Sequence, residues 1–139
     1  MKKLIIIAAA LVVLAGCSTS QTSADSADPV PGPRVLYRGA GDASVQVTRD
    51  SGFLGSGCYM GVFWNGKLAA RIGSGETVKL SVPSGENLIG MGSDPEGNGL
   101  CAIDGLAVRE VPANLKPSEN KRFRISGDGS GFQLAPTSF

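Results

Sequence analysis

Three cysteines are the residues of this chain best suited to covalent chemistry, and they stand at positions 17, 58 and 101. Cys17 follows the small residues Ala15 and Gly16 and precedes a polar Ser-Thr-Ser run. This is the pattern of a bacterial lipoprotein signal, in which the cysteine thiol takes a lipid and the chain is cut before it. The sequence therefore predicts a lipid attached at Cys17.

The residues before Cys17 support this interpretation. Lys2 and Lys3 precede an apolar run over residues 4–16, which is too short for a membrane-spanning helix of about 20 residues. We interpret residues 1–16 as a cleaved signal peptide. The alternative is an ordinary secretory signal with an incidental cysteine, which is disfavoured because plain export gives that cysteine no role.

Acyl chains such as palmitate on Cys17 would supply the membrane affinity. Each buried methylene contributes about 0.8 kcal/mol, and several chains hold a protein stably. We therefore expect no other membrane-binding surface. Ser18 stands where an aspartate would indicate retention in the inner membrane. This favours lipid anchoring in the outer membrane, with either the periplasmic face or the cell surface open.

The other two cysteines are predicted to pair. Cys58 and Cys101 form an even set in an exported, oxidising compartment. A disulfide would stabilise the domain by roughly 4 kcal/mol, as an upper figure. Two buried thiols, a redox pair or metal ligands are the alternatives. The absence of a C-x-x-C spacing and of histidine argues against the last two.

No residue pattern predicts catalysis or a cofactor. The chain has no histidine, which removes the commonest general base. Asp94, Glu96 and Asp104 could surround Ca²⁺, but their spacing does not match a calcium loop. A serine nucleophile would need a base such as Lys67 or Lys79, both expected at solvated strand positions. We expect a protein that is not an enzyme and holds no cofactor or metal.

Charge and aromatic residues bear on the partners. Removing Lys2 and Lys3 from 13 basic residues leaves 11 against 12 acidic ones, a balance that disfavours nucleic-acid binding. Strand alternation places Tyr59 and Phe63 on the face opposite Met60, Val62 and Trp64. Tyr59 and Phe63 are either core on a second face or a partner surface.

Residues 17–33 are predicted to form the lipidated N-terminus and a disordered linker. Ser, Thr, Ala and Asp alternate there without an apolar period, and Pro29, Pro31 and Pro33 close the segment. Such a segment buries too little apolar surface to offset the entropy of ordering. The prolines favour a stiffer spacer over a ligand for a proline-binding domain.

Residues 34–139 are predicted to fold as one all-β domain. Short runs alternate apolar and polar residues, and Asn65-Gly66 between two of them is a hairpin signal. We expect a small antiparallel β-sandwich of about seven or eight strands, immunoglobulin- or transthyretin-like, or a small barrel. The expected strands cover residues 35–38, 44–48, 58–64, 67–72, 77–82, 87–91, 106–111, 121–125 and 132–134, and residues 114–117 are expected in a loop.

Residues 50–59 (DSGFLGSGCY), 65–71 (NGKLAAR) and 94–101 (DPEGNGLC) resemble a family of small uncharacterised bacterial outer-membrane lipoproteins. The resemblance covers roughly residues 45–125. Some members occur on prophages, and some carry the label 3-isopropylmalate dehydratase. That chemistry would need three cysteines on an iron–sulfur cluster, whereas here one cysteine is predicted to carry lipid. The resemblance implies no catalytic residues.

These observations favour a non-enzymatic envelope binding module whose partner is a protein, a glycan or a phage component. The first alternative is a structural subunit of an envelope machine, since the strand pattern is similar in architecture to sandwich lipoproteins of type VI secretion. An envelope-acting hydrolase is the least favoured. A contiguous exposed apolar patch would favour the binding module, and a cleft holding two perturbed carboxylates would favour the hydrolase.

Overall fold

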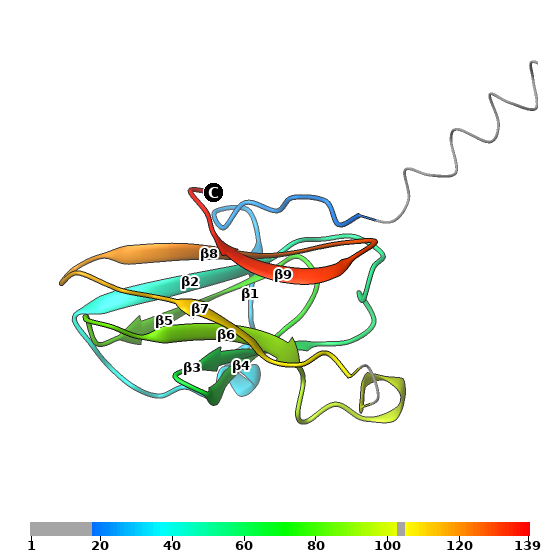
Figure 1. Ribbon diagram of the computed structural model, residues 1–139, viewed down its shortest axis with the longest axis horizontal. Coiled ribbons are helices and arrows are strands. Elements are labelled where there is room, and N and C mark those ends of the chain that lie inside the picture. Colours follow the sequence, from blue (N-terminus) through cyan, green and yellow to red (C-terminus); the bar gives the residue numbers. More distant parts are fainter. Residues whose placement is uncertain (1–17, 103–104) are drawn as a thin grey trace, which may run out of the picture.

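The computed structural model describes residues 18–102 and 105–139, which form two facing β-sheets (Figure 1). The described strands are β1 (Asp28–Pro29), β2 (Ala43–Arg49), β3 (Met60–Trp64), β4 (Lys67–Ile72), β5 (Glu76–Val82), β6 (Leu88–Ser93), β7 (Arg109–Pro112), β8 (Asn120–Asp128) and β9 (Gly131–Pro136). One sheet has the order β1-β5-β2-β8-β9 and the other β4-β3-β6-β7. The predicted small β-sandwich is confirmed.

Most strand pairs are antiparallel, but β2–β8 and β1–β5 are parallel. Between β2 and β8 the chain crosses from one sheet to the other four times, and β8 returns to the five-stranded sheet parallel to β2. The sandwich is therefore predominantly antiparallel, as expected, with two parallel pairs that no local sequence pattern marks. In the described part of the chain, no helix is long and apolar enough to cross a membrane.

The predicted alternation of buried and exposed residues is confirmed in the five-stranded sheet. In β5, Val78, Leu80 and Val82 face the core while Lys79 and Ser81 are exposed. Every residue of β3 is buried, as expected for a central strand covered on both faces. The inward side chains of β2, β5 and β8 pack against those of β3, β4 and β6 in one core.

The turn between β3 and β4 follows the sequence signal. Asn65 and Gly66 have φ values of 48° and 78°, the left-handed region that a tight two-residue hairpin turn requires. The Asn65 side chain also accepts a hydrogen bond from the backbone of Leu88 at 2.8 Å, which ties this turn to β6.

The predicted strand over residues 35–38 is wrong. The backbone N–H groups of Leu36 and Tyr37 both donate to the carbonyl of Ala69, so the alternating ladder of a strand cannot form. Only Val35 makes an isolated bridge, to Ala70. This segment and η2 (Gly32–Arg34) lie along the edge of β4.

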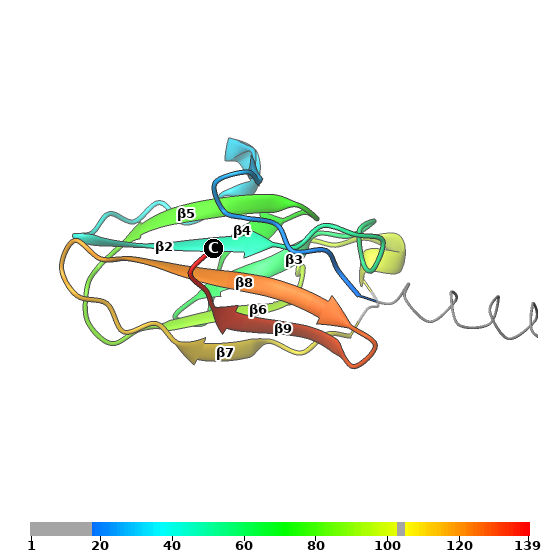
Figure 2. The same ribbon diagram turned by 90° about the horizontal axis from the view of Figure 1, so that it is seen from above.

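The flexible linker was also predicted wrongly, since its described part (residues 18–33) is docked on the domain. Figure 2 shows this segment crossing the outer face of the five-stranded sheet toward β5. Asp50 is its main attachment, because its buried carboxylate accepts bonds from Thr19 Oγ1 at 3.0 Å and from the Thr22 N–H at 3.3 Å. Ala24 and Val30 are buried. Polar contacts to distant residues therefore replace the apolar pattern that the segment lacks.

Candidate binding site at the loop end of the sandwich

The two ends of the sandwich differ, and the described chain begins at one of them. We call this the loop end; its described part consists of residues 50–59, 94–102 and 105–108 and the β8–β9 turn, at the right of Figure 1. We call the opposite end the turn end; it holds the Asn65-Gly66 turn and residues 83–87 and 113–119.

An apolar cavity of about 340 Å³ opens between the sheets at the loop end. Its lining includes Arg49, Tyr59, Met60, Leu106 and Phe132. This volume lies at the lower end of the range of small-molecule sites, which are typically apolar with a few polar groups. The site can therefore accept the apolar part of a small ligand.

Arg49 is the only charged residue among the described residues that line the cavity. Alternation along β2 turns it inward after Val45 and Val47, and the side chain is 1% exposed. Its guanidinium donates to the carbonyls of Gly55 at 2.6 Å, Cys58 at 2.8 Å and Ile72 at 3.1 Å. It also lies 5.6 Å from the centre of the Phe132 ring, a cation–π distance.

The charge of Arg49 has no direct counter-ion among residues 18–102 and 105–139, where every recorded ion pair involves another arginine. Burial lowers the pKa of Arg49 to about 10, with only a distant opposing effect of Glu76. The side chain is therefore a cation at neutral pH, inside an apolar cavity.

A disulfide holds the two long loops of this end together. Cys58 and Cys101 are bonded, with 5.4 Å between their Cα atoms, which confirms the predicted pair. The bond places the loop around Phe53 beside the loop that carries η3 (Gly99–Ala102).

Tyr59 and Phe63, the two aromatic residues proposed as a partner surface, have different surroundings. Tyr59 is 40% exposed, and the guanidinium carbons of Arg34 and Arg71 lie 4.1 and 5.4 Å from the centre of its ring. Phe63 is only 7% exposed, because its ring lies close over Gly61, whose missing side chain leaves room for it. Tyr59 remains accessible to a partner, whereas Phe63 does not.

Arg71 also occupies the region considered for calcium. It binds Asp94 through two nitrogen atoms and reaches Glu96 at 3.1 Å. The hydrogen bonds that Arg71 donates to Asp94 raise the pKa of Arg71. Asp104, the third proposed ligand, lies outside the described residues. Within the described ranges, no three acidic or cysteine side chains gather as a metal site.

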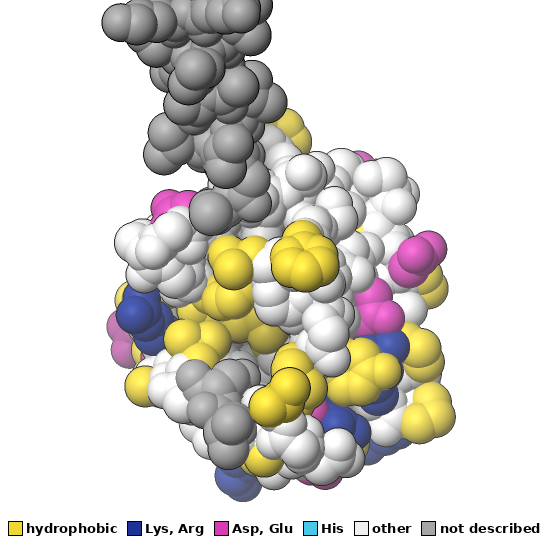
Figure 3. Space-filling view, turned by 90° about the vertical axis from the view of Figure 1, so that its right-hand side faces the viewer, with side chains coloured by type: hydrophobic (Ala, Val, Ile, Leu, Met, Phe, Trp, Pro, Cys, Tyr) yellow, Lys and Arg dark blue, Asp and Glu magenta, His cyan; other side chains and the backbone are white. Residues whose placement is uncertain are grey.

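Apolar side chains are exposed on the loops of the same end, and one of them, Tyr59, also lines the cavity. Phe53 is 94% exposed and Leu100 is 83% exposed, and Tyr59 and Val108 are partly exposed nearby in the same loops. We call these four residues the apolar rim. Figure 3 looks onto this end and shows apolar side chains gathered across it. A contiguous patch of this kind marks an interaction surface more often than a solvated one.

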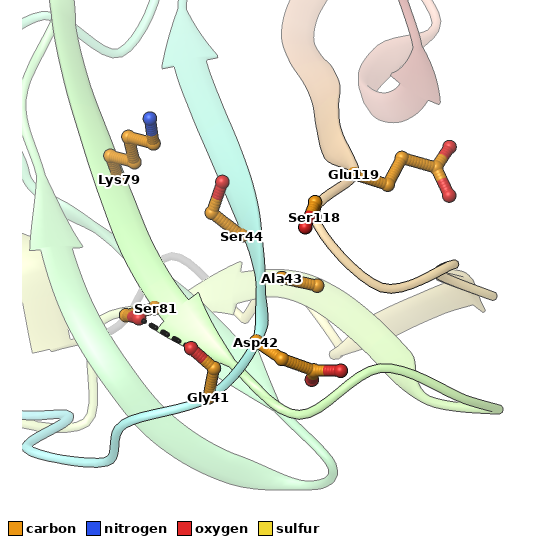
Figure 4. Close-up of a pocket in the computed structure, with 8 residues that line it drawn as sticks. All are labelled: Gly41, Asp42, Ala43, Ser44, Lys79, Ser81, Ser118 and Glu119. Atoms are coloured by element: carbon orange, nitrogen blue, oxygen red, sulfur yellow. Dashed lines mark hydrogen bonds between the residues drawn. The ribbon is translucent and has the colours of Figure 1, made fainter.

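The turn end has a larger hollow of about 450 Å³, but it is polar and open (Figure 4). Its polar groups are bonded to the protein: Ser81 donates to the Gly41 carbonyl, and Ser44 donates to Asn120. Asp42 accepts bonds from the Ser84 backbone N–H and hydroxyl, which lower the pKa of Asp42. Lys79, considered above as a base, is exposed on β5. The described side chains here do not assemble a nucleophile with a base.

The sequence did not predict that Arg49, Leu106 and Phe132 would together line a cavity. The alternation in β2 already placed position 49 inward, but an arginine is not expected in a core. Comparison of the chain with family models, with curated proteins and with solved structures finds no match.

Proposed function

We propose that this protein is a lipid-anchored envelope protein of the outer membrane that acts by binding rather than by catalysis. The anchor is the lipid predicted on Cys17. The binding site is the cavity at the loop end, which takes the apolar part of a ligand. The observation that carries the proposal is this apolar cavity with one buried cation, at the end where the chain leads back to Cys17.

The cavity suggests the chemistry of the ligand. Its described lining is apolar except for Arg49, three of whose N–H groups already donate to backbone carbonyls. The guanidinium forms no ion pair with a described residue, and a cation in such a low-dielectric site is stabilised by an anion. We therefore expect an apolar molecule with a negatively charged group, in preference to its neutral analogue.

The anchor is tested in cells with the Cys17→Ser variant. The native protein should sediment with the outer membrane, and mass spectrometry of its N-terminal peptide should show acyl groups on Cys17. The variant should carry no lipid and should be released from the membrane. Sedimentation of the variant with the outer membrane would contradict the proposed anchor.

The cavity is tested by calorimetric titration of the purified protein with dodecanoate and with dodecanol, which match in length but differ in charge. We expect dodecanoate to bind more tightly. Leu106→Trp should fill the cavity and abolish binding, while Leu88→Trp, at the turn end, should not change it. Equal binding by both tryptophan variants, or no binding of either probe, would reject the cavity as the site.

A further inference from the structure

We propose that the loop end of the sandwich lies directly on the lipid bilayer, with Phe53 and Leu100 inserted among the lipid headgroups. This inference rests on the proposed acylation of Cys17. It differs from the expectation that a flexible tether holds the domain away from the membrane and that the domain needs no membrane-binding surface.

The first step is the short distance between Cys17 and the folded domain. The backbone N–H of Thr19 donates to the Gly127 carbonyl at 2.9 Å, and Gly127 in turn donates to the Thr19 hydroxyl at 2.9 Å. Two residues span at most about 7 Å when extended. The lipid-bearing residue is therefore held within that distance of Thr19, at the loop end.

The second step is the position of Phe53. Ser20 pairs with Ser51 through backbone bonds of 2.7 and 3.1 Å. A Cβ atom at Gly52 would lie 3.3 Å from the Thr19 Cα atom, so Gly52 packs directly against the first docked residues. Phe53 follows Gly52 and is almost fully exposed, so its ring lies beside the point at which the chain leads to the lipid.

The third step is the second apolar loop. The Cys58–Cys101 disulfide fixes residue 101 next to the loop of Phe53, and Leu100 precedes it with most of its surface exposed. Two apolar side chains thus project from two cross-linked loops at one end of the molecule. Among the described residues, the core cluster and the hydrophobic side chains packed against it include neither Phe53 nor Leu100.

The charge of these loops fits a bilayer as the occupant. Residues 51–59 and 97–102 contain no charged residue, so inserting them among the headgroups desolvates no charge. Interfacial segments lie with their apolar groups about 5–10 Å into the boundary between headgroups and acyl chains. Two apolar side chains alone would bind a membrane weakly. The acyl chains proposed on Cys17 would supply the affinity, so Phe53 and Leu100 would only have to orient the domain on the bilayer.

The experiment uses the chain from Cys17 onward, which includes every described residue. With Cys58 and Cys101 in a disulfide, Cys17 is its only free thiol. It can be coupled to a maleimide phospholipid in phosphatidylcholine vesicles whose acyl chains carry bromine, a quencher of tryptophan fluorescence. Phe53→Trp and Leu100→Trp are the test variants, and Leu88→Trp is the matched control at the turn end. Trp64, the only native tryptophan, is buried and gives a constant background.

We expect bromine to quench most of the fluorescence of the introduced tryptophan in Phe53→Trp and Leu100→Trp. It should quench little of the fluorescence of the introduced tryptophan in Leu88→Trp. Equal quenching of all three, or none in the first two, would overturn the proposed orientation. The proposal would also be overturned if the protein formed a concentration-dependent dimer that requires Phe53 and showed no quenching. A second copy of the chain, and not the bilayer, would then cover the apolar rim. In this experiment the lipid is coupled to Cys17 chemically, so the quenching result does not depend on whether the cell acylates Cys17. Whether the cell does so is tested separately, by the mass spectrum of the N-terminal peptide.

Discussion

The two ends of the sandwich close the same core in different ways. At the turn end, Asn65-Gly66 reverses the chain in two residues, and side-chain bonds such as Asn65 to Asn87 join neighbouring turns. At the loop end, two long loops are held by a disulfide and by the buried Arg49. The turn end is polar, whereas the loop end exposes Phe53 and Leu100.

This difference distinguishes the turns that the fold needs to close its strands from the long loops that it does not need. Closing a hairpin needs only a suitable turn and satisfied backbone groups, as at the turn end. Long loops with exposed phenylalanine and leucine add apolar surface in water without stabilising the domain. This contrast supports our proposal that the loop end carries the binding site, and the following predictions test it.

The largest effect is expected from Cys58→Ser/Cys101→Ser. Loss of the cross-link should lower the free energy of unfolding by roughly 4 kcal/mol, because the unfolded chain gains conformational freedom. Urea unfolding gives the stability, and hydrogen exchange shows where protection is lost. We expect residues 50–59 and 97–102 to lose the most protection, because the cross-link also holds these loops, while β2 and β5 lose protection only through the fall in global stability. An unchanged urea midpoint would contradict this role of the disulfide.

Arg49→Met should have the next largest effect, a loss of about 3 kcal/mol in the free energy of unfolding. The carbonyls of Gly55, Cys58 and Ile72 would each lose a donor in a buried setting. Arg109→Met is the control, since Arg109 is exposed at the same end, and surface changes usually stay within about 0.5 kcal/mol. Equal urea midpoints for the two variants would show that Arg49 does not hold the loops.

The smallest effect is expected at the turn end, from Gly66→Ala. Gly66 has a φ of 78°, where a β-carbon costs about 1 kcal/mol. Its control is Gly57→Ala at the loop end, where a β-carbon would meet nothing within 4 Å and φ is not in the left-handed region. Thermal unfolding should separate the two variants by a few degrees. The reverse order would mean that the loops, not the turns, depend on glycine geometry.

The features that could be predicted from the sequence are those with a local signal. The period of two in β5 and the Asn65-Gly66 turn both depend on neighbouring residues, and both were located correctly. The disulfide was also predicted, because the export signal left an even pair of cysteines.

The features that could not be predicted depend on distant partners. The docking of residues 18–33 rests on bonds from Thr19 and Thr22 to Asp50, about thirty positions later. No local pattern marks such contacts. The cavity likewise combines Arg49 with Leu106 and Phe132, which come together only when the two sheets meet.

The bonds between Thr19 and Gly127 also set an order of events during biogenesis. They join positions 108 residues apart, so they can form only after nearly the whole chain has left the export channel. Pairing of β2 with β8 spans a similar separation and is slow for the same reason. Until then the residues beside Cys17 stay open to the enzymes that would acylate and cut the chain. In the proposed lipoprotein, enzymes that act before this point would therefore meet a chain in which Thr19 is not yet docked on the domain.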